Sequence, residues 1–388
     1  MYLSLYTIEK GKVRIMNRIE NKARQYIEYC LKHFKGYKEN WNYEDGCVLT
    51  GCVQLYEATG DQRFQKLVLE YLKNFIREDG TIAKYEEEKY NIDSINSGKV
   101  LFAAYDWTGE EKYRRAIEVL MNQLRHQPRT KCGSFWHKKI YPNQIWLDGL
   151  YMAQPFYMAY ETRLGKKENY NDIVSQFKNV RQYLYDQQKA LYYHAYDEAR
   201  ELFWADKTTG TSPNFWLRSM GWYLMALVDV MSEMDETIFE QYKVLEDLLR
   251  EAVRGILQYQ DKESSLFYQV IDRADAEGNY LETSGSAMIG YAILKGCRLG
   301  ALLKEKYQPV GEAIAASLTE RMIIEEDGAW RLTGICSVAG LGPADNLRRD
   351  GSVEYYLSEP VVCDDHKGIG AYLMMIAEEL LLNSKAEA

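Results

Sequence analysis

The sequence has few features of a secreted, membrane-bound or nucleic-acid-binding protein. Its seven cysteines are scattered, odd in number and contain no CxxC pair, which favours a reducing cytoplasm over a disulfide framework. No apolar run is long enough for a transmembrane helix, and the N-terminal segment lacks the apolar centre of a signal peptide. The formal net charge of -9 argues against nucleic acid and anionic membranes as partners. We therefore expect a cytoplasmic protein, in which Met16 offers an alternative start and residues 1–15 form a loose extension.

The short motifs of several enzyme classes are also missing. There is no GxGxxG, P-loop or GxSxG, which excludes the common nucleotide-binding and serine-hydrolase sites. There is no HExxH, and the crowded run from Cys363 to His366 consists of adjacent residues, which rarely point at one ion. We predict no metal and no cofactor.

Aromatic residues, in contrast, are abundant. Thirty-two Tyr and eight Trp are more than a plain core needs. Such residues often line carbohydrate sites, where a flat ring stacks on a sugar face and its polar edge makes hydrogen bonds. Dense packing between helices explains the same composition equally well. Composition alone leaves both explanations open.

A repeat organises the chain. Six apolar, helix-like segments each begin near a glycine: Gly46, Gly98, Gly149, Gly221, Gly285 and Gly370. Three of them end at a Thr-Gly or Leu-Gly turn that is followed by charges, and their spacing varies between roughly 50 and 85 residues. Repetition of one unit over the whole length predicts a single domain, residues 1–388.

Amphipathic segments alternate with these apolar ones. Residues 14–34, for example, place Ile15, Ile19, Ile27, Leu31 and Phe34 on one stripe at helical spacing. An apolar helix is buried and an amphipathic one covers it, so six such pairs predict an all-α (α/α)6 barrel of six helical hairpins. Strand signals are restricted to two short segments, residues 265–273 and 329–334.

Polar residues stand just before the apolar segments. They are Asp45, Asp93, Asn96, Asp148, Arg218, Glu282, Thr283, Ser284, Asp365 and His366. If the inner helices are parallel, their N-termini share one rim and these side chains converge there. Helix N-termini also carry partial positive charge, so an acidic protein can still bind a carboxylate at that rim.

Asp148 illustrates the ambiguity of these positions. Asp, Ser and Thr are preferred N-caps, so Asp148 is either a helix cap or the acid of an active site. The loops at the predicted rim add Trp136, His137, Lys138 and Trp146 before Asp148. A later loop adds His194, Asp197, Trp204, Trp216 and Trp222 around Arg218. Rings for stacking, a cation for a carboxylate and an acid for proton transfer together favour a sugar site.

Six motifs resemble glycoside hydrolase family 105, the unsaturated rhamnogalacturonyl hydrolases. They are "WLDGLYMAQPFYMAY", "YYHAYDE", "FWLRSMGWY", "ETSGSAM", "GICSVAGLG" and "YYLSEPVVCDDHKGIGAY". The likeness runs from about Asn42 to about Glu379. The family is related to the unsaturated glucuronyl hydrolases of family 88, and both have a six-hairpin α/α barrel.

The resemblance implies an unusual glycosidase that hydrates the C4=C5 double bond of an unsaturated uronate instead of attacking C1. By motif match, Asp148 in "WLDG" is the general acid and base, and Asp93 in "NIDSIN" is the second aspartate, which positions water or tunes Asp148. The substrate-binding residues implied by the same motifs and loops are Tyr43, His137, Lys138, Trp146, His194, Trp216, Arg218, Trp222 and His366. The expected partner is an unsaturated uronyl oligosaccharide of about disaccharide size, whereas the oligomeric state stays open.

Other functions compete with this one. The same chemistry on a glucuronyl-rhamnose or glycosaminoglycan disaccharide is one alternative, and a sugar-binding barrel without catalysis is another. The latter is disfavoured because Asp93 and Asp148 are both retained. A sugar 2-epimerase would use paired histidines where this chain has aspartates. The chain departs from the resembled pattern at Ser219-Met220, where many relatives have Gly-Asn, which leaves the fine substrate choice open.

Overall fold

The computed structural model describes residues 20–235 and 238–384. The predicted extension, together with Ile15 and Ile19 of the predicted stripe, lies outside these residues. The helices are α2 (Asn21–His33), α3 (Tyr43–Thr59), α4 (Gln62–Lys73), η1 (Glu87–Lys89), α5 (Asp93–Asn96), α6 (Lys99–Thr108), α7 (Glu111–His126), α8 (Leu147–Arg163), α9 (Tyr170–Leu184), α10 (Leu217–Glu233), α11 (Phe239–Ile256), η2 (Leu257–Tyr259), α12 (Thr283–Arg298), α13 (Lys304–Met322), α14 (Val353–Ser358) and α15 (His366–Ser384).

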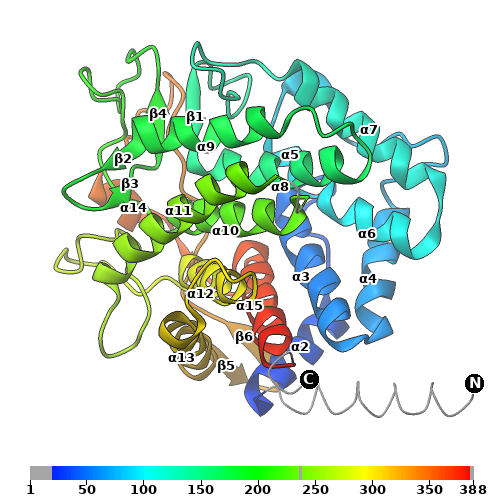
Figure 1. Cartoon of the computed structure of the whole chain (residues 1–388). Coiled ribbons are helices and arrows are strands. Elements are labelled where there is room, and N and C mark those ends of the chain that lie inside the picture. Colours follow the sequence, from blue (N-terminus) through cyan, green and yellow to red (C-terminus); the bar gives the residue numbers. More distant parts are fainter. Residues whose placement is uncertain (1–19, 236–237, 385–388) are drawn as a thin grey trace, which may run out of the picture.

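Twelve of these helices form two concentric rings. The inner ring consists of α3, α6, α8, α10, α12 and α15, and the outer ring consists of α2, α4, α7, α9, α11 and α13. Each inner helix packs against its neighbours, and α15 lies beside α3, so the last inner helix closes the ring on the first (Figure 1). The predicted all-α (α/α)6 barrel is confirmed.

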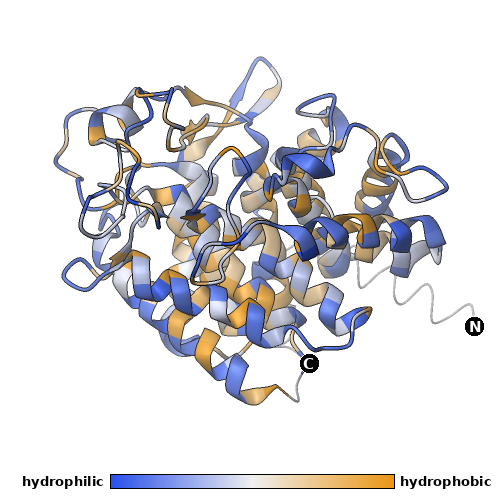
Figure 2. Ribbon diagram, turned by 90° about the horizontal axis from the view of Figure 1, so that it is seen from above, coloured by the Kyte–Doolittle hydropathy of each residue, from blue (hydrophilic) through white to orange (hydrophobic). Residues whose placement is uncertain are grey.

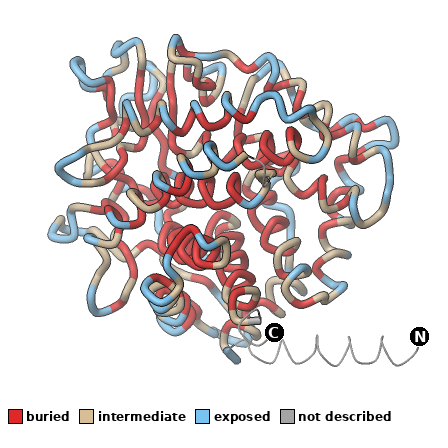
Figure 3. Tube along the Cα trace, viewed as in Figure 1, coloured by how far each residue is buried: buried red, intermediate tan, exposed pale blue. Residues whose placement is uncertain are grey.

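Burial distinguishes the two rings. Outer helix α7 buries one stripe, which includes Tyr113, Ile117, Leu120 and Leu124 at helical spacing. Inner helix α8, by contrast, is buried along almost its whole length (Figure 3). Hydrophobic residues accordingly follow the central helices, whereas the surrounding loops are mostly hydrophilic (Figure 2). None of the helices within the described ranges combines the length and apolar content that a membrane crossing requires.

Several helix ends have clear local causes. The side chain of Asn42 accepts a hydrogen bond from the Asp45 N–H and caps α3, and Glu282 caps α12 in the same way. Helices α3 and α6 end at Gly60 and Gly109, whose φ angles of 68° and 67° suit glycine. These are the predicted Thr-Gly turns, and they are confirmed as helix stops.

Glycines let the inner helices approach closely. A Cβ atom on Gly370 of α15 would lie 2.4 Å from the carbonyl carbon of Cys47 in α3. A Cβ on Gly221 of α10 would lie 2.7 Å from the Cβ of Met288 in α12. The repeated glycines thus set the spacing between neighbouring inner helices near the end where those helices begin.

Eight short strands supplement the helices. They are β1 (Gln144–Trp146), β2 (Tyr185–Asp186), β3 (Leu191–Tyr192), β4 (Ala195–Asp197), β5 (Ile323–Glu326), β6 (Ala329–Leu332), β7 (Ile335–Cys336) and β8 (Val361–Val362), and they pair antiparallel as β1–β4, β2–β3, β5–β6 and β7–β8. Predicted segment 329–334 provides β6. Segment 265–273 forms only isolated bridges, Trp216 with Val270 and Tyr268 with Leu281.

Replacement of Gly370 by Ala tests the close approach of α15 and α3. Because the added methyl group would meet backbone atoms of Cys47, the two helices must separate, and we expect a loss of about 1–3 kcal/mol in the free energy of unfolding, measured with urea. Gly36→Ala is the control, because its Cβ would lie 3.6 Å from the nearest atoms. Equal stability of the two variants would contradict the interpretation.

Candidate active site

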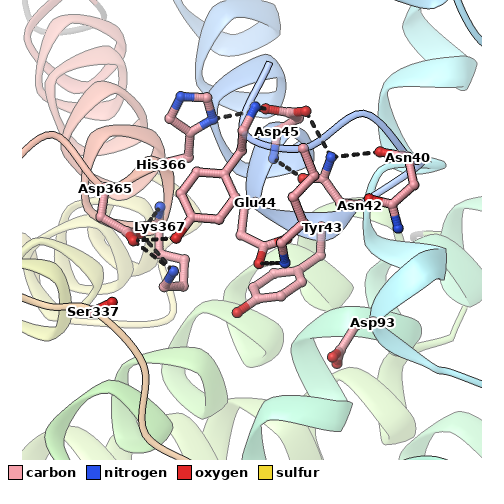
Figure 4. Close-up of polar contacts among 12 residues, drawn as sticks. Asn40, Asn42, Tyr43, Glu44, Asp45, Asp93, Ser337, Asp365, His366 and Lys367 are labelled. Atoms are coloured by element: carbon pink, nitrogen blue, oxygen red, sulfur yellow. Dashed lines mark hydrogen bonds and ion pairs between the residues drawn. The ribbon is translucent and has the colours of Figure 1, made fainter. Parts of the chain in front are cut away.

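The N-terminal ends of the inner helices meet at one rim, and side chains from neighbouring helices contact one another there. Arg218 of α10 donates to Ser284 Oγ of α12 over 3.1 Å. His366 of α15 lies 2.8 Å from a carboxylate oxygen of Asp45 in α3. Ser97, between α5 and α6, donates to the Asn42 carbonyl oxygen over 2.5 Å. Predicted rim residues of neighbouring helices therefore meet in the pairs Arg218–Ser284 and Asp45–His366, and Figure 4 shows the side of the rim that α3 and α15 form.

The β1–β4 pair places Asp148 beside His194. Trp146 pairs with Ala195, and the Leu147 N–H donates to the His194 carbonyl oxygen over 3.1 Å. As a result, His194 Nε2 lies 3.3 Å from Asp148 Oδ2. Both atoms are buried, and neither has a hydrogen-bond partner among the described residues.

Asp148 is not a helix cap. Helix α8 is preceded by Trp146 at its N-cap position, and no side chain caps the helix. Asp148 is the second residue of the helix, and 13% of its side chain is exposed. A carboxylate with an unsatisfied buried oxygen and an exposed edge has the capacity to accept or donate a proton at this rim.

His194 is fixed from its other side. Its Nδ1 shares a 2.8 Å hydrogen bond with the hydroxyl of Tyr356, and the side chain is completely buried. The Trp216 ring lies 4.7 Å from the His194 ring, between centroids. The imidazole is therefore held with Nε2 directed at Asp148.

Asp93 has a different electrostatic environment. Its Oδ2 lies 2.5 Å from Lys138 Nζ, and its Oδ1 lies 3.5 Å from His137 Nε2. Burial alone would raise the pKa of the Asp93 carboxyl, but the Lys138 ammonium and His137 outweigh burial and hold that pKa below its ordinary value. Asp93 is therefore ionised at neutral pH.

His137 stays neutral in this arrangement. Burial lowers the pKa of its imidazole to about 4, although Asp93 acts in the opposite direction. Its ring stacks on Trp146 with a centroid distance of 4.5 Å and an angle of 8°, and the Trp146 ring lies 4.9 Å from Tyr141. Gly149 gives the ring its space, because a Cβ there would approach His137 Nδ1 to 3.2 Å.

The two terminal nitrogens of the Arg218 guanidinium both donate hydrogen bonds within the protein. Its Nη1 donates to the carbonyl oxygen of Cys336 over 2.5 Å as well as to Ser284, and its Nη2 donates to the carbonyl oxygen of Ser337 over 3.4 Å. Its Nε is buried and has no hydrogen-bond partner among the described residues. Arg218 thus anchors the chain that follows β7 and keeps a positive charge at the rim, packed over the ring of Trp216 at 4.9 Å.

Two predicted residues lie apart from the two aspartates. Trp222 is buried in the main core, where it stacks on Tyr151 at 4.7 Å. His366 bonds to Asp45 and stacks on Phe34 at 5.6 Å. The structure gives neither residue a contact with Asp93 or Asp148.

The α3–α15 side of the rim contains charged residues that sequence reasoning missed (Figure 4). Lys367 Nζ lies 2.7 Å from Asp365, and the Tyr37 hydroxyl donates to the same carboxylate over 2.8 Å. Lys38 forms an ion pair with Glu44. Lys367 and Tyr356 both stand in the quoted motif "YYLSEPVVCDDHKGIGAY", but the motif assigned neither residue a role.

Three side chains of the Cys363–His366 segment are directed at other residues and not at a common ion. Asp364 bonds to Tyr26 and Arg331, Asp365 bonds to Lys367, and His366 bonds to Asp45. The three side chains thus have separate partners and do not face one common point. Within residues 20–235 and 238–384, no group of three or more His, Cys, Asp or Glu side chains is placed to hold a metal ion.

Comparisons with known proteins show a family match and similar chains over most of the sequence. The chain matches the profile of Glycosyl Hydrolase Family 88 over residues 8–382. It is 41% identical over 236 residues to Protein Atu3128 of Agrobacterium fabrum, which covers 60% of this chain and 99% of that protein. It is 26% identical over 315 residues to the unsaturated rhamnogalacturonyl hydrolase YesR of Bacillus subtilis, which covers 80% of this chain and 83% of YesR. The structure of a family 105 glycoside hydrolase from C. acetobutylicum ATCC 824 superposes with a TM-score of 0.88 at 41% identity, covering 92% of this chain and 99% of that chain.

The low pKa of His137 predicts a pH-dependent stability. An unfolded chain binds a proton on this histidine near pH 6.5, whereas the folded protein binds it only near pH 4, so stability falls as pH decreases through this window, by up to about 3 kcal/mol. We expect the difference in unfolding free energy between wild type and His137→Gln to shrink from pH 7 to pH 4. A difference that is constant over this range, measured by urea unfolding, would refute a neutral buried His137.

Proposed function

The chain belongs to the glycoside hydrolases grouped in families 88 and 105, and from this membership we propose that it removes a 4,5-unsaturated galacturonyl residue from the non-reducing end of rhamnogalacturonan-derived oligosaccharides. The similarity to YesR, whose name specifies an unsaturated rhamnogalacturonyl substrate, supports the bond between galacturonate and rhamnose as the one that is cleaved. One observation carries the catalytic assignment. Asp148 caps no helix, and one of its carboxylate oxygens is buried without a hydrogen-bond partner among the described residues, next to His194.

The proposed reaction is hydration of an enol ether. The ring oxygen donates electrons to the C4=C5 double bond, so a proton added at C4 leaves an oxocarbenium-like centre at C5. Water adds to C5 and gives a hemiketal, which opens and releases the neighbouring sugar. This route needs one proton donor and one activated water, unlike hydrolysis at C1 by two carboxylic acids.

Asp148 and Asp93 have separate roles in this proposal. Asp93 is ionised because Lys138 lowers the pKa of its carboxyl, so it is unsuited to donate a proton. We assign proton donation at C4 and activation of water to Asp148, whose position beside His194 Nε2 lets the imidazole stabilise its carboxylate after transfer. Asp93, neutral His137 and charged Lys138 then orient the water and the sugar hydroxyls.

The sugar contacts follow from the rings and charges at the rim. Trp146 and Trp216 are nearly buried, with exposures of 5% and 1%, whereas Tyr43, the first residue of α3, is half-buried. Burial raises the pKa of Tyr43 well above its ordinary value, so its hydroxyl stays neutral and donates to an anionic sugar. Arg218, with a free Nε–H, supplies a positive potential for the uronate carboxylate.

The first test is an assay with unsaturated galacturonyl-rhamnose. We expect the ultraviolet absorbance of the conjugated double bond to decay while free rhamnose appears, and the saturated disaccharide to remain intact. Turnover only of glucuronyl-linked or glycosaminoglycan-derived disaccharides would reassign the substrate. Inactivity on every unsaturated uronide would leave a sugar-binding barrel instead of an enzyme. In deuterated water, hydration places one deuterium at C4 of the product, which NMR detects.

Replacement of Asp148 by Asn tests the proton donor. The amide keeps the shape of the side chain but does not transfer a proton, so we expect kcat to fall by about 10²- to 10⁴-fold with little change in substrate binding. Asp275→Asn is the control, because the Asp275 side chain is 87% exposed and its carboxylate lies 4.0 Å from Arg273. Near-wild-type kcat in Asp148→Asn would remove Asp148 from its assigned role.

A further inference from the structure

A cavity of about 200 Å³ adjoins the candidate active site. It shares Tyr43, Asp93 and Lys138 with that site. Its other walls come mainly from the connection before α3, which provides Lys38, and from the chain between α4 and α5, which provides Lys84, Glu86 and Lys89. Glu44 in the first turn of α3 completes the charged lining. Figure 4 shows Asp93 on one side of this space and Tyr43 with the Asn40–Asn42 segment on the other.

The lining of the cavity is richer in cations than the chain as a whole. Four lysines line it, against the three carboxylates of Glu44, Glu86 and Asp93, whereas the whole chain has a net charge of -9. Side chains with amide and phenol groups fill the remaining walls. Such a lining suits a sugar that carries both hydroxyl groups and a carboxylate.

The four lysines fall into an inner and an outer pair. The inner lysines, Lys38 and Lys138, bond to carboxylates that are nearly buried, with side-chain exposures of 5% and 11%. The outer lysines, Lys84 and Lys89, are 58% and 65% exposed.

The partners of the outer lysines are exposed as well. Glu39 lies 3.5 Å from Lys84 and is 97% exposed, and Glu86 lies 2.7 Å from Lys89 and is 61% exposed. Exposed pairs of this kind contribute little to stability, so both ammonium groups can turn to another anion at small cost. The outer wall of the cavity therefore has two positive charges available for a ligand.

We propose that this cavity is a subsite for the leaving saccharide, where Lys84 and Lys89 bind the carboxylate of a second uronate. The inference rests on the proposed function, because it takes Asp93 and Lys138 as the boundary with the reacting sugar. In a rhamnogalacturonan, uronates alternate with rhamnose, so the tetrasaccharide with an unsaturated end has such a second uronate and the disaccharide has none. The protein thus prefers oligosaccharides longer than the disaccharide.

The test compares these two substrates in a charge-reversed variant. Wild type is expected to have a lower KM for the unsaturated tetrasaccharide than for the disaccharide, and this preference is expected to shrink at high salt. Lys84→Glu/Lys89→Glu is expected to raise KM for the tetrasaccharide about five- to tenfold and to leave kcat and KM for the disaccharide unchanged. Lys66→Glu/Lys262→Glu, the same charge change at two exposed lysines outside the cavity, is the control.

A binding measurement separates this inference from the proposed reaction. In an Asp148→Asn background, calorimetry gives the Kd of both saccharides without turnover. Weaker binding of only the tetrasaccharide in the Lys84→Glu/Lys89→Glu variant supports the subsite even if the reaction proves different. Equal KM and Kd changes for both saccharides, equal effects in the control variant, or a wild type that binds both saccharides equally would overturn the subsite.

Discussion

The close approach of the inner helices near their N-termini is the constraint on which the active-site rim depends. Gly370 lets α15 contact the backbone of α3 at Cys47, and Gly285 lets α12 pack on Leu217 of α10. Wider spacing would separate side chains that now touch across helix boundaries, such as Arg218 with Ser284. The repeat is therefore more than an architectural motif, because the helix spacing sets distances between groups on different helices.

Charge balance is the second organising feature of the rim. Lys138 pairs with Asp93, Lys367 pairs with Asp365, and Lys38 pairs with Glu44. The attraction within each pair offsets the desolvation penalty that its ionised groups incur in this nearly buried site. Asp148 differs from Asp93, Asp365 and Glu44, each of which pairs with a lysine, since its neighbour within ion-pair distance is the imidazole of His194. This asymmetry separates one carboxylate for proton transfer from those that hold charge and shape.

Much of the fold was predictable because its repeat is long. Apolar and amphipathic segments alternate over helical lengths, so the barrel and its shared rim followed from spacing, and the family motifs located Asp93 and Asp148. Short features gave no such signal: the β1–β4 pair has only three residues in each strand, yet it brings Trp146 and His194 together. Contacts between residues far apart in the sequence, such as Tyr356 with His194, could not be predicted either. Trp222 shared a motif with Arg218, but at this helical spacing its ring points into the core.

The position of α15 beside α3 has a consequence for synthesis of the protein. α3 is translated early and α15 more than 300 residues later, so a nascent chain carries the inner helices α3 to α12 with one side of the ring open. The apolar faces that α15 covers on α3 and α12 lack this cover throughout that interval, and exposed apolar surface promotes aggregation. Completion of the ring also brings Asp365, His366 and Lys367 to the rim, so the rim is assembled only when this stage ends.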